Sequence, residues 1–315
     1  MKIIDSKTIR SLGITPSQCV EWVRESFSMK YEASLPPKIS LHPQNDDFIN
    51  TMPCLLPEAY HRYGVKVVTR IEGAIPALSS TELLFNSATG ELLAMLDADW
   101  ITAMRTGAVA TLSAQLYRKS NNVVYGIAGL GNTGRATILC LLDSEPNIHH
   151  HVYLLRYKNQ AELFMERMKD YKNVSFTIVD SPKEIVKNCD VIFSCITSAT
   201  GLFCEDDSAF RKGCVVVPVH TRGFQNCDLF FDKVFGDDTG HVCGFRYFEK
   251  FKKFAELSEV LLGKNPGRES EDERILAYNI GLGLHDVLFA NKIYELTQEK
   301  SPSIPFEKAT DKFWV

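Results

Sequence analysis

The sequence predicts an α/β protein with a Rossmann-type, doubly wound nucleotide-binding domain and a second domain of mixed α+β character. Strands and helices alternate regularly after residue 121, and a glycine-rich loop separates the first strand of this region from its first helix. Residues 1–118 follow a different pattern, with a helix, several strands and a hairpin. The length of 315 residues exceeds the size at which single hydrophobic cores stop growing, which indicates two domains.

Local signals place the elements of the first region. Thr15 is a good helix cap, Pro16 suits the first helical position, and Gly90 marks the loop of a hairpin. The expected elements are a helix over residues 15–31, strands at 38–42 and 64–71, a hairpin over 81–96 and a helix over 97–117.

Buried parallel strands are typical of the second region, because its strands are nearly continuous apolar runs. Strands are expected at residues 123–128, 151–156, 174–179, 190–196 and 214–219, with helices at 132–143, 159–171 and 181–188. A long apolar helix is expected over residues 275–295.

Composition excludes several classes of protein. The hydrophobic fraction is 45% and the charged fraction 23%, which is typical of a folded globular chain. A net charge of −4 provides no basic field for nucleic acid, and no apolar run is long enough to span a membrane. The start of the chain lacks the features of a signal peptide. Nine cysteines without C-x-x-C spacing indicate reduced, buried thiols, so we expect a cytoplasmic protein.

The glycine-rich loop, Gly-Leu-Gly-Asn-Thr-Gly at residues 129–134, is the strongest motif. Gly129 permits the tight turn, Gly131 lets the backbone approach a pyrophosphate, and Gly134 lets helix and strand pack closely. Asn132 and Thr133 begin the predicted helix, where N–H groups and the helix dipole favour phosphates. These five residues are predicted to bind a dinucleotide cofactor.

The end of the second nucleotide-binding strand predicts which cofactor binds. NAD enzymes usually carry an acidic residue about 20 positions after the glycine loop. Arg156 stands there instead, and Lys158 follows it. Because a guanidinium pairs with phosphate through two hydrogen bonds, we expect NADP(H) held by these two residues, with NAD(H) as the other candidate. The alternative interpretation is a pair of solvated loop cations.

Taken together, these motifs resemble the ornithine cyclodeaminase/mu-crystallin family over most of the chain. The Arg-Thr-Gly-Ala segment at residues 105–108 is a specific sign of it. Further segments that carry the resemblance are residues 64–68, 86–90, the glycine loop, 197–198, 267–268 and 280–286.

The resemblance implies an architecture and an activity. A dimerising substrate domain is built from both chain ends, here residues 1–118 and 288–315, around an inserted Rossmann domain at 119–287. The expected activity is that of an NAD(P)-dependent oxidoreductase acting on the C–N bond of an amino acid or imine. The expected partners are such a small molecule, or a 2-oxo acid, and a second copy of the chain in a homodimer.

Matching positions in the family suggest roles for several residues. Lys66 matches the substrate lysine and Arg105 the arginine that holds the substrate carboxylate, a task for which a fixed cation is suited. Lys66 lies in an apolar strand, and burial lowers the pKa of a lysine, which also makes it an acid–base candidate. Lys38 stands where many members carry a substrate arginine. The alternatives are that Lys38 and Lys66 face solvent and that Arg105 forms an ion pair on the helix surface.

Cofactor contacts outside the glycine loop also follow from the resemblance. Thr106 matches a position near the cofactor phosphates. Thr197 and Ser198 match positions beside the nicotinamide ribose.

Two positions depart from the cyclodeaminase pattern. Asn50 stands where cyclodeaminases carry a glutamate, and Arg222 where they carry an aspartate. Neither residue is a base near pH 7, so cyclodeamination is disfavoured. Arg222 together with Lys66 and Arg105 favours a substrate with more than one carboxylate, because buried cations need partners. An Arg222 that points into solvent is the alternative.

A histidine at the end of the fifth strand completes the predicted site. His220 lies at the carboxyl edge of the sheet, where α/β proteins bind ligands, and is a candidate proton donor. The run His149 to His151 is not expected to bind a metal, since neighbouring strand residues point in opposite directions. Two other functions stay open: conversion of ornithine to proline and ammonia with catalytic NAD, and NADPH-dependent ligand binding with little turnover, as in mu-crystallin.

Overall fold

The computed structural model describes residues 1–315 apart from 45–46, 120–122, 198, 298–301, 306–308 and 314–315. Contacts divide the chain into two compact units. Unit 1 contains residues 1–13, 32–101 and 286–315, and unit 2 contains residues 14–31 and 102–285. These units place residues 14–31 and 102–118 with the nucleotide-binding fold, and the domain boundaries expected from the sequence stay a prediction.

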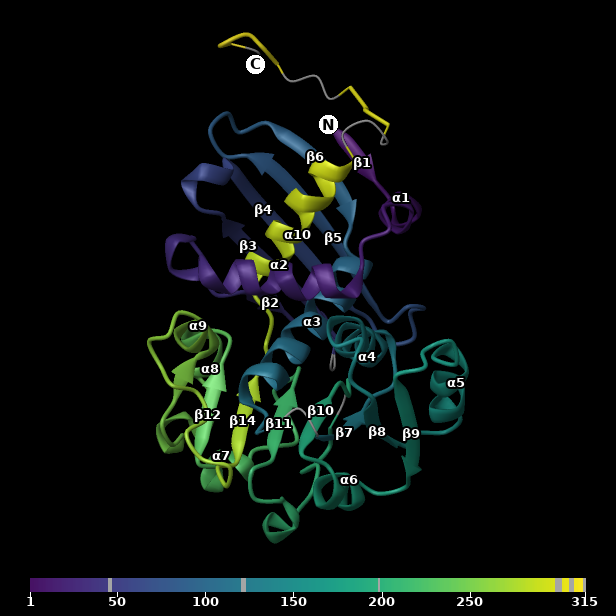
Figure 1. The fold of residues 1–315 in the computed structure, drawn as a ribbon. Coiled ribbons are helices and arrows are strands. Elements are labelled where there is room, and N and C mark those ends of the chain that lie inside the picture. Colours follow the sequence, from purple (N-terminus) through teal and green to yellow (C-terminus); the bar gives the residue numbers. More distant parts are fainter. Residues whose placement is uncertain (45–46, 120–122, 198, 298–301, 306–308, 314–315) are drawn as a thin grey trace. The chain divides into compact units, whose positions relative to one another are not determined.

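Unit 2 is built on an eight-stranded, all-parallel sheet with the strand order β13-β12-β14-β11-β10-β7-β8-β9 (Figure 1). The strands are β7 (Val124–Ala128), β8 (His150–Leu155), β9 (Val174–Val179), β10 (Val191–Ser194), β11 (Val215–Pro218), β12 (Lys233–Gly236), β13 (Ala255–Glu256) and β14 (Ile275–Tyr278). From β9 to β14 this is the order of a dinucleotide-binding sheet, in which the order reverses between β7 and β10.

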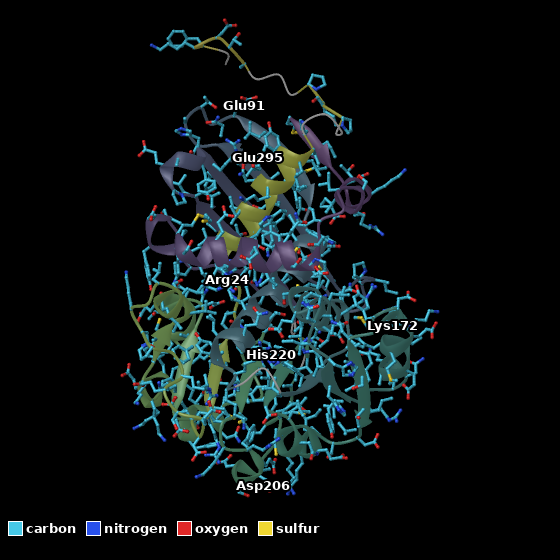
Figure 2. All side chains as sticks on the ribbon, in the orientation of Figure 1. Arg24, Glu91, Lys172, Asp206, His220 and Glu295 are labelled. Atoms are coloured by element: carbon cyan, nitrogen blue, oxygen red, sulfur yellow. The ribbon has the colours of Figure 1, made fainter. Side chains whose placement is uncertain are left out.

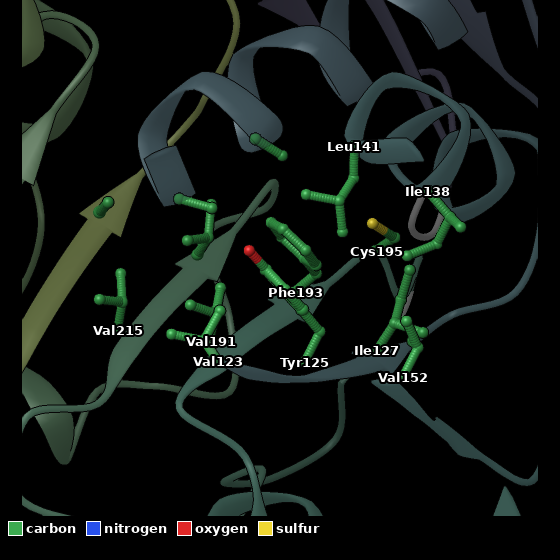
Figure 3. Close-up of a cluster of buried hydrophobic side chains, with 14 of the residues drawn as sticks. Val123, Tyr125, Ile127, Ile138, Leu141, Val152, Val191, Phe193, Cys195 and Val215 are labelled. Atoms are coloured by element: carbon green, nitrogen blue, oxygen red, sulfur yellow. The ribbon is translucent and has the colours of Figure 1, made fainter. Parts of the chain in front are cut away.

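Helices cover both faces of this sheet. The helices of unit 2 are α2 (Pro16–Ser28), which packs on α4 and α9, and α3 (Asp99–Tyr117), α4 (Asn132–Ser144), α5 (Gln160–Arg167), α6 (Pro182–Asn188), α7 (Cys227–Phe230), α8 (Thr239–Val242) and α9 (Leu257–Leu261). Side chains of successive strand residues enter two separate hydrophobic clusters. Phe193 belongs to the cluster that α3 and α4 cover, whereas Ile192 belongs to the other. Figure 3 shows the first cluster, in which Tyr125 and Phe193 stack with ring centroids 5.9 Å apart.

Unit 1 is a six-stranded mixed sheet with the order β1-β6-β5-β4-β3-β2. Its strands are β1 (Lys2–Ile4), β2 (Ile39–Leu41), β3 (Phe48–Leu55), β4 (Arg62–Arg70), β5 (Leu78–Asn86) and β6 (Leu92–Asp97), and a short helix α1 (Ser6–Ser11) follows β1. All neighbours are antiparallel except β1 and β6. Helix α10 (Gly283–Leu296) packs on β4, where a Cβ at Gly64 would lie 2.7 Å from Val287 (Figure 1).

One predicted element is wrong. Residues 275–295 do not form a single helix, because Ile275–Tyr278 is the buried strand β14 and the helix begins only at Gly283. Gly281, with φ +93°, separates the two elements in a conformation that L-residues avoid. A short buried strand and a buried helix segment look alike as apolar runs, and the glycine is the signal that distinguishes them here.

Two further features are the state of the cysteines and the character of the helices. The nine cysteines are free thiols, and eight of them are buried. In the part of the chain that the structure describes, none of the helices is both long and apolar enough to cross a membrane.

Candidate cofactor and substrate site

The glycine loop connects β7 to α4 and has the shape that a dinucleotide needs. Gly129 has φ +85°, and a Cβ there would lie 2.4 Å from the backbone carbonyl of Cys195. A Cβ at Gly134 would lie 2.1 Å from the carbonyl oxygen of Gly129. A Cβ at Gly131, in contrast, would meet no atom within 4 Å. Two glycines therefore hold the turn closed, and the third leaves open space beside the start of α4.

Helix α4 offers unused donors at this open space. Gly131 is its N-cap and provides no side chain to accept the first N–H groups. Asn132 and Thr133 begin the helix at that point. Free N–H groups and the positive end of the helix dipole are the features that bind phosphates, so these residues fit the pyrophosphate of a dinucleotide.

Helix α3 carries the Arg-Thr-Gly-Ala segment against α4. A Cβ at Gly107 would lie 2.5 Å from the backbone of Ala136 and Thr137, so only glycine lets the two helices approach this closely. This contact places Arg105 and Thr106 on a helix packed against the one that follows the glycine loop. The hydroxyl of Thr106 donates to the carbonyl of Thr102 at 2.6 Å.

Gly281 leaves room for the side chain of Arg105. Arg105 is 7% exposed, and a Cβ at Gly281 would lie 2.5 Å from its Nη1. The N–H of Gly281 donates to Oδ2 of Asp237 at 2.6 Å, which holds the turn in place. Arg105 is therefore a buried cation with a defined position, as carboxylate recognition requires.

Arg156 has acidic neighbours at the end of β8. Its Nε donates to Oδ1 of Asp180 at 2.7 Å, and its Nη1 pairs with the carboxylate of Glu162. These hydrogen bonds raise the pKa of Arg156. The ammonium of Lys158 lies 5.4 Å from the ring centroid of Tyr157. The 2′-phosphate of NADP(H) would share Arg156 with these two carboxylates. The role of Arg156 in the choice of cofactor stays a prediction.

Residues expected beside the nicotinamide follow β10 and β11. Thr197 is exposed after β10, and Ser198 lies outside the described residues. His220 follows β11 and its Nε2 lies 2.7 Å from Oγ of Ser194 (Figure 2). Burial lowers the pKa of His220 to about 4, so the imidazole is neutral near pH 7 and is not a cationic acid there.

Arg222 lines a cavity of about 540 Å³ formed by the loops that follow β10 and β11. Arg246 and Tyr247 line the same cavity, and the Arg246 guanidinium lies 5.0 Å from the Tyr247 ring centroid. Leu202 and Leu229 add apolar surface. None of the described lining residues carries a carboxylate. The cavity therefore combines two cations with apolar walls, which suits an organic anion.

Arg246 and Tyr247 are site candidates that the sequence analysis missed. They lie in an aromatic-rich stretch typical of a core, and more than 20 residues separate them from Arg222. Nothing in the local pattern signals that the two segments meet.

Lys66 is the centre of a buried charge cluster in unit 1. The residue is 0% exposed, and its Nζ lies 2.6 Å from Oδ1 of Asp286, in the first turn of α10. Glu82, directly opposite in β5, is also 0% exposed. Two roles were expected of Lys66, binding of the substrate carboxylate and acid–base chemistry, and both stay predictions. Neither Asp286 nor Glu82 belongs to the site predicted from the sequence.

Lys38 and Asn50 belong to the segments on the β3–β2 side of Lys66. Lys38 is half-buried and immediately precedes the edge strand β2. Asn50 lies on β3 opposite Val68, and its Oδ1 is buried. No group of three or more metal-ligating side chains is found among the described residues.

The parallel sheet, the strand order and the glycine loop define a Rossmann-type dinucleotide-binding protein. The model of the ornithine cyclodeaminase/mu-crystallin family matches residues 6–215. The chain belongs to this family, as its motifs predicted.

Known relatives share the sequence and the fold. An N-((2S)-2-amino-2-carboxyethyl)-L-glutamate dehydrogenase of Staphylococcus aureus is 26% identical over 71% of this chain and 69% of its own. A Δ1-pyrroline-2-carboxylate reductase of Thermococcus litoralis, solved with NADH and L-proline, has a TM-score of 0.85 at 22% identity, covering 96% of this chain and 100% of its own. An archaeal alanine dehydrogenase dimer with bound NAD has a TM-score of 0.83 at 23% identity, covering 98% and 99%.

These comparisons confirm two predictions. The fold class is that of both solved structures. The enzyme class is an NAD(P)-dependent oxidoreductase that acts on C–N bonds.

Proposed function

We propose that the protein is an amino-acid dehydrogenase or imine reductase whose substrate carries more than one carboxylate and whose preferred cofactor is NADP(H). The observation that supports this most strongly is the cavity with Arg222 and Arg246 beside the carboxyl ends of β10 and β11. Ligands of α/β proteins bind at this edge of the sheet. The dehydrogenase relative from Staphylococcus aureus has a name that describes a substrate with several carboxylates.

Each group then has a defined task. The nicotinamide, when bound, supplies or accepts a hydride at the substrate carbon that bears the nitrogen. Lys66 and Arg105 bind the carboxylate on that carbon, and Lys38 assists them. Arg222 and Arg246 bind a second carboxylate. His220, or a water, handles the proton of the substrate nitrogen.

Cyclodeamination is the function to be separated from this one. It requires a carboxylate base, and Asn50 and Arg222 occupy the two positions where cyclodeaminases carry one. The test is the loss of NADPH and NADH absorbance at neutral pH with Δ1-pyrroline-2-carboxylate, and with pyruvate or 2-oxoglutarate plus an amine. We expect consumption, faster with NADPH and with 2-oxoglutarate. Bound cofactor without consumption in any reaction would contradict the proposal, and tighter binding of NADH would contradict the cofactor preference.

Removing both cavity arginines will separate dicarboxylate from monocarboxylate substrates. In Arg222→Met/Arg246→Met, we expect KM for the imine of 2-oxoglutarate to rise about tenfold, because a solvent-accessible ionic contact to the substrate is lost. KM for Δ1-pyrroline-2-carboxylate should stay within about twofold of the wild-type value. Arg167→Met, at an exposed position on α5, is the matched control. Equal changes in KM for both substrates would show that the cavity does not bind the second carboxylate.

We also propose a homodimer. The edge strand β2 exposes Ile39 and Leu41, at 60% and 61%, which is unfavourable for an isolated edge. Sedimentation equilibrium should give twice the chain mass of 35.5 kDa, and a monomeric mass would refute the proposal.

A further inference from the structure

Glu82 is a buried carboxylate for which the proposed chemistry has so far no use. It lies on β5 directly opposite Lys66 on β4. Both side chains are 0% exposed. Side chains of directly opposed residues on one face of an antiparallel pair have Cβ atoms about 5 Å apart. Glu82 is therefore the cross-strand neighbour of the lysine that is proposed to bind the substrate carboxylate.

The sheet makes room for this carboxylate. A Cβ at Gly64 would lie 2.8 Å from Oε1 of Glu82 and 2.7 Å from Val287 of α10. The carboxylate thus reaches over Gly64, at the point where the sheet meets the first turns of the helix. Asp286, which pairs with Lys66, is the residue before Val287 on that helix.

The thiol of Cys54 lies near the same two carboxylates. Burial, together with the negative charges of Glu82 and Asp286, raises the pKa of Cys54 to about 12. Cys54 lies opposite Gly64 on β3. Cys54 and Glu82 therefore flank Gly64 and Lys66 on the neighbouring strands, and Asp286 lies beside Lys66.

Strand β3, on the other side of β4, contains no aspartate or glutamate. Asn50, Met52 and Cys54 alternate along β3 and so share the face on which Lys66 lies. Asn50 stands where cyclodeaminases are expected to carry their acid. In this chain the carboxylate lies on the opposite side of Lys66, on β5.

Glutamates are almost never fully buried unless paired, and the residue directly opposite Glu82 is the buried Lys66. Strand β5 places the buried Leu84 on the same face two residues later. Ionisable groups kept in such positions concentrate at functional sites.

We propose that Glu82, in place of His220 or a water, contacts the nitrogen of the substrate and exchanges its proton. This inference rests on the proposed function. The nitrogen is attached to the carbon that bears the carboxylate, so a group beside Lys66 is placed to reach it. In the reductive direction, the Glu82 carboxyl gives its proton to the imine nitrogen as the carbon gains a hydride. The C=N π pair becomes the nitrogen lone pair and then the N–H bond, and water returns a proton to Glu82.

Binding measurements test the contact with nitrogen apart from turnover. L-Proline and cyclopentanecarboxylate form one pair of probes, and L-glutamate and glutarate form another; each pair differs by the loss of the nitrogen. We expect the enzyme with oxidised cofactor to bind the amino acid more tightly in calorimetry. Glu82→Gln should reduce this preference about tenfold or more, while affinity for the nitrogen-free acid changes less than about twofold.

Turnover provides the second readout. With Δ1-pyrroline-2-carboxylate, Glu82→Gln should lower kcat by about 10²- to 10⁴-fold with little change in KM, as expected for loss of a proton donor. Glu82→Asp keeps the carboxyl group and should recover part of kcat, which also covers the case that Glu82→Gln folds poorly. Glu91→Gln, on the exposed hairpin at the edge of unit 1, is the matched control (Figure 2).

The outcomes separate the two proposals. If the wild-type enzyme oxidises NAD(P)H with an imine but Glu82→Gln keeps the wild-type kcat and amino-acid preference, this inference is overturned while the proposed function stands. If no imine causes oxidation of the cofactor by the wild-type enzyme, the proposed function fails, and the inference fails with it.

Discussion

Replacing Lys66 by methionine will both destabilise the protein and weaken substrate binding. Methionine has a similar length but cannot pair with Asp286, whose Oδ1 now lies 2.6 Å from the lysine Nζ. Removing one member of a fully buried ion pair costs about 3–5 kcal/mol of unfolding free energy. Because a charged hydrogen bond to the substrate carboxylate is also lost, we expect kcat/KM to fall by about 10- to 100-fold. Urea denaturation and steady-state kinetics measure the two effects.

A double variant separates stability from function. In Lys66→Met/Asp286→Asn both charges are removed, and replacing a buried pair by neutral groups is often close to neutral for stability. We expect the unfolding free energy to return most of the way to the wild-type value while kcat/KM stays low. If the double variant recovered activity as well, Lys66 would not bind the substrate carboxylate.

Changing Gly131 to serine will reduce cofactor affinity without loss of stability. Serine is a better N-cap than glycine by a few tenths of a kcal/mol, and nothing in the chain lies within 4 Å of its Cβ position. However, its hydroxyl would occupy the N–H groups at the start of α4 that the pyrophosphate requires. Loss of charge-assisted hydrogen bonds of about 1.5–3 kcal/mol corresponds to a 10- to 100-fold rise in Kd.

Two other glycines provide the comparison for this prediction. Gly244→Ser, also in open space, should change neither Kd nor Tm. Gly129→Ala should lower Tm, since its methyl group would meet the backbone of Cys195 at 2.4 Å. Fluorescence titration with NADPH gives Kd and thermal unfolding gives Tm. An unchanged Kd in Gly131→Ser would contradict cofactor binding at this helix.

Local patterns were sufficient to predict the strands β7 to β11 of the nucleotide-binding unit and the helices between them. Its strands are apolar runs, and parallel strands are connected by right-handed crossovers. Gly129, Gly131 and Gly134 belong to one short turn, so their spacing can be recognised directly in the sequence. The failure at residues 275–278 has the same origin, because burial on both faces removes the alternation that distinguishes a strand from a helix.

Contacts between distant segments could not be predicted in this way. Arg105 packs against Gly281, and Arg222 shares its cavity with Arg246, across separations that no periodicity encodes. Glu82 did carry a signal: it shares the buried face of its strand with Leu84, so a period of two placed a charge among core positions. The pairing of its strand with the strand of Lys66, and therefore the closeness of the two residues, could be learned only from the fold.

Transfer of a labelled hydride tests the central claim most directly. The enzyme is supplied with NADPH deuterated at C4 of the nicotinamide, in separate preparations for each face, and with Δ1-pyrroline-2-carboxylate or with 2-oxoglutarate and an amine. We predict that one of the two preparations places deuterium on the carbon that bears the nitrogen in the product. An unlabelled product with both preparations, or release of ammonia from ornithine without net consumption of the cofactor, would contradict the account.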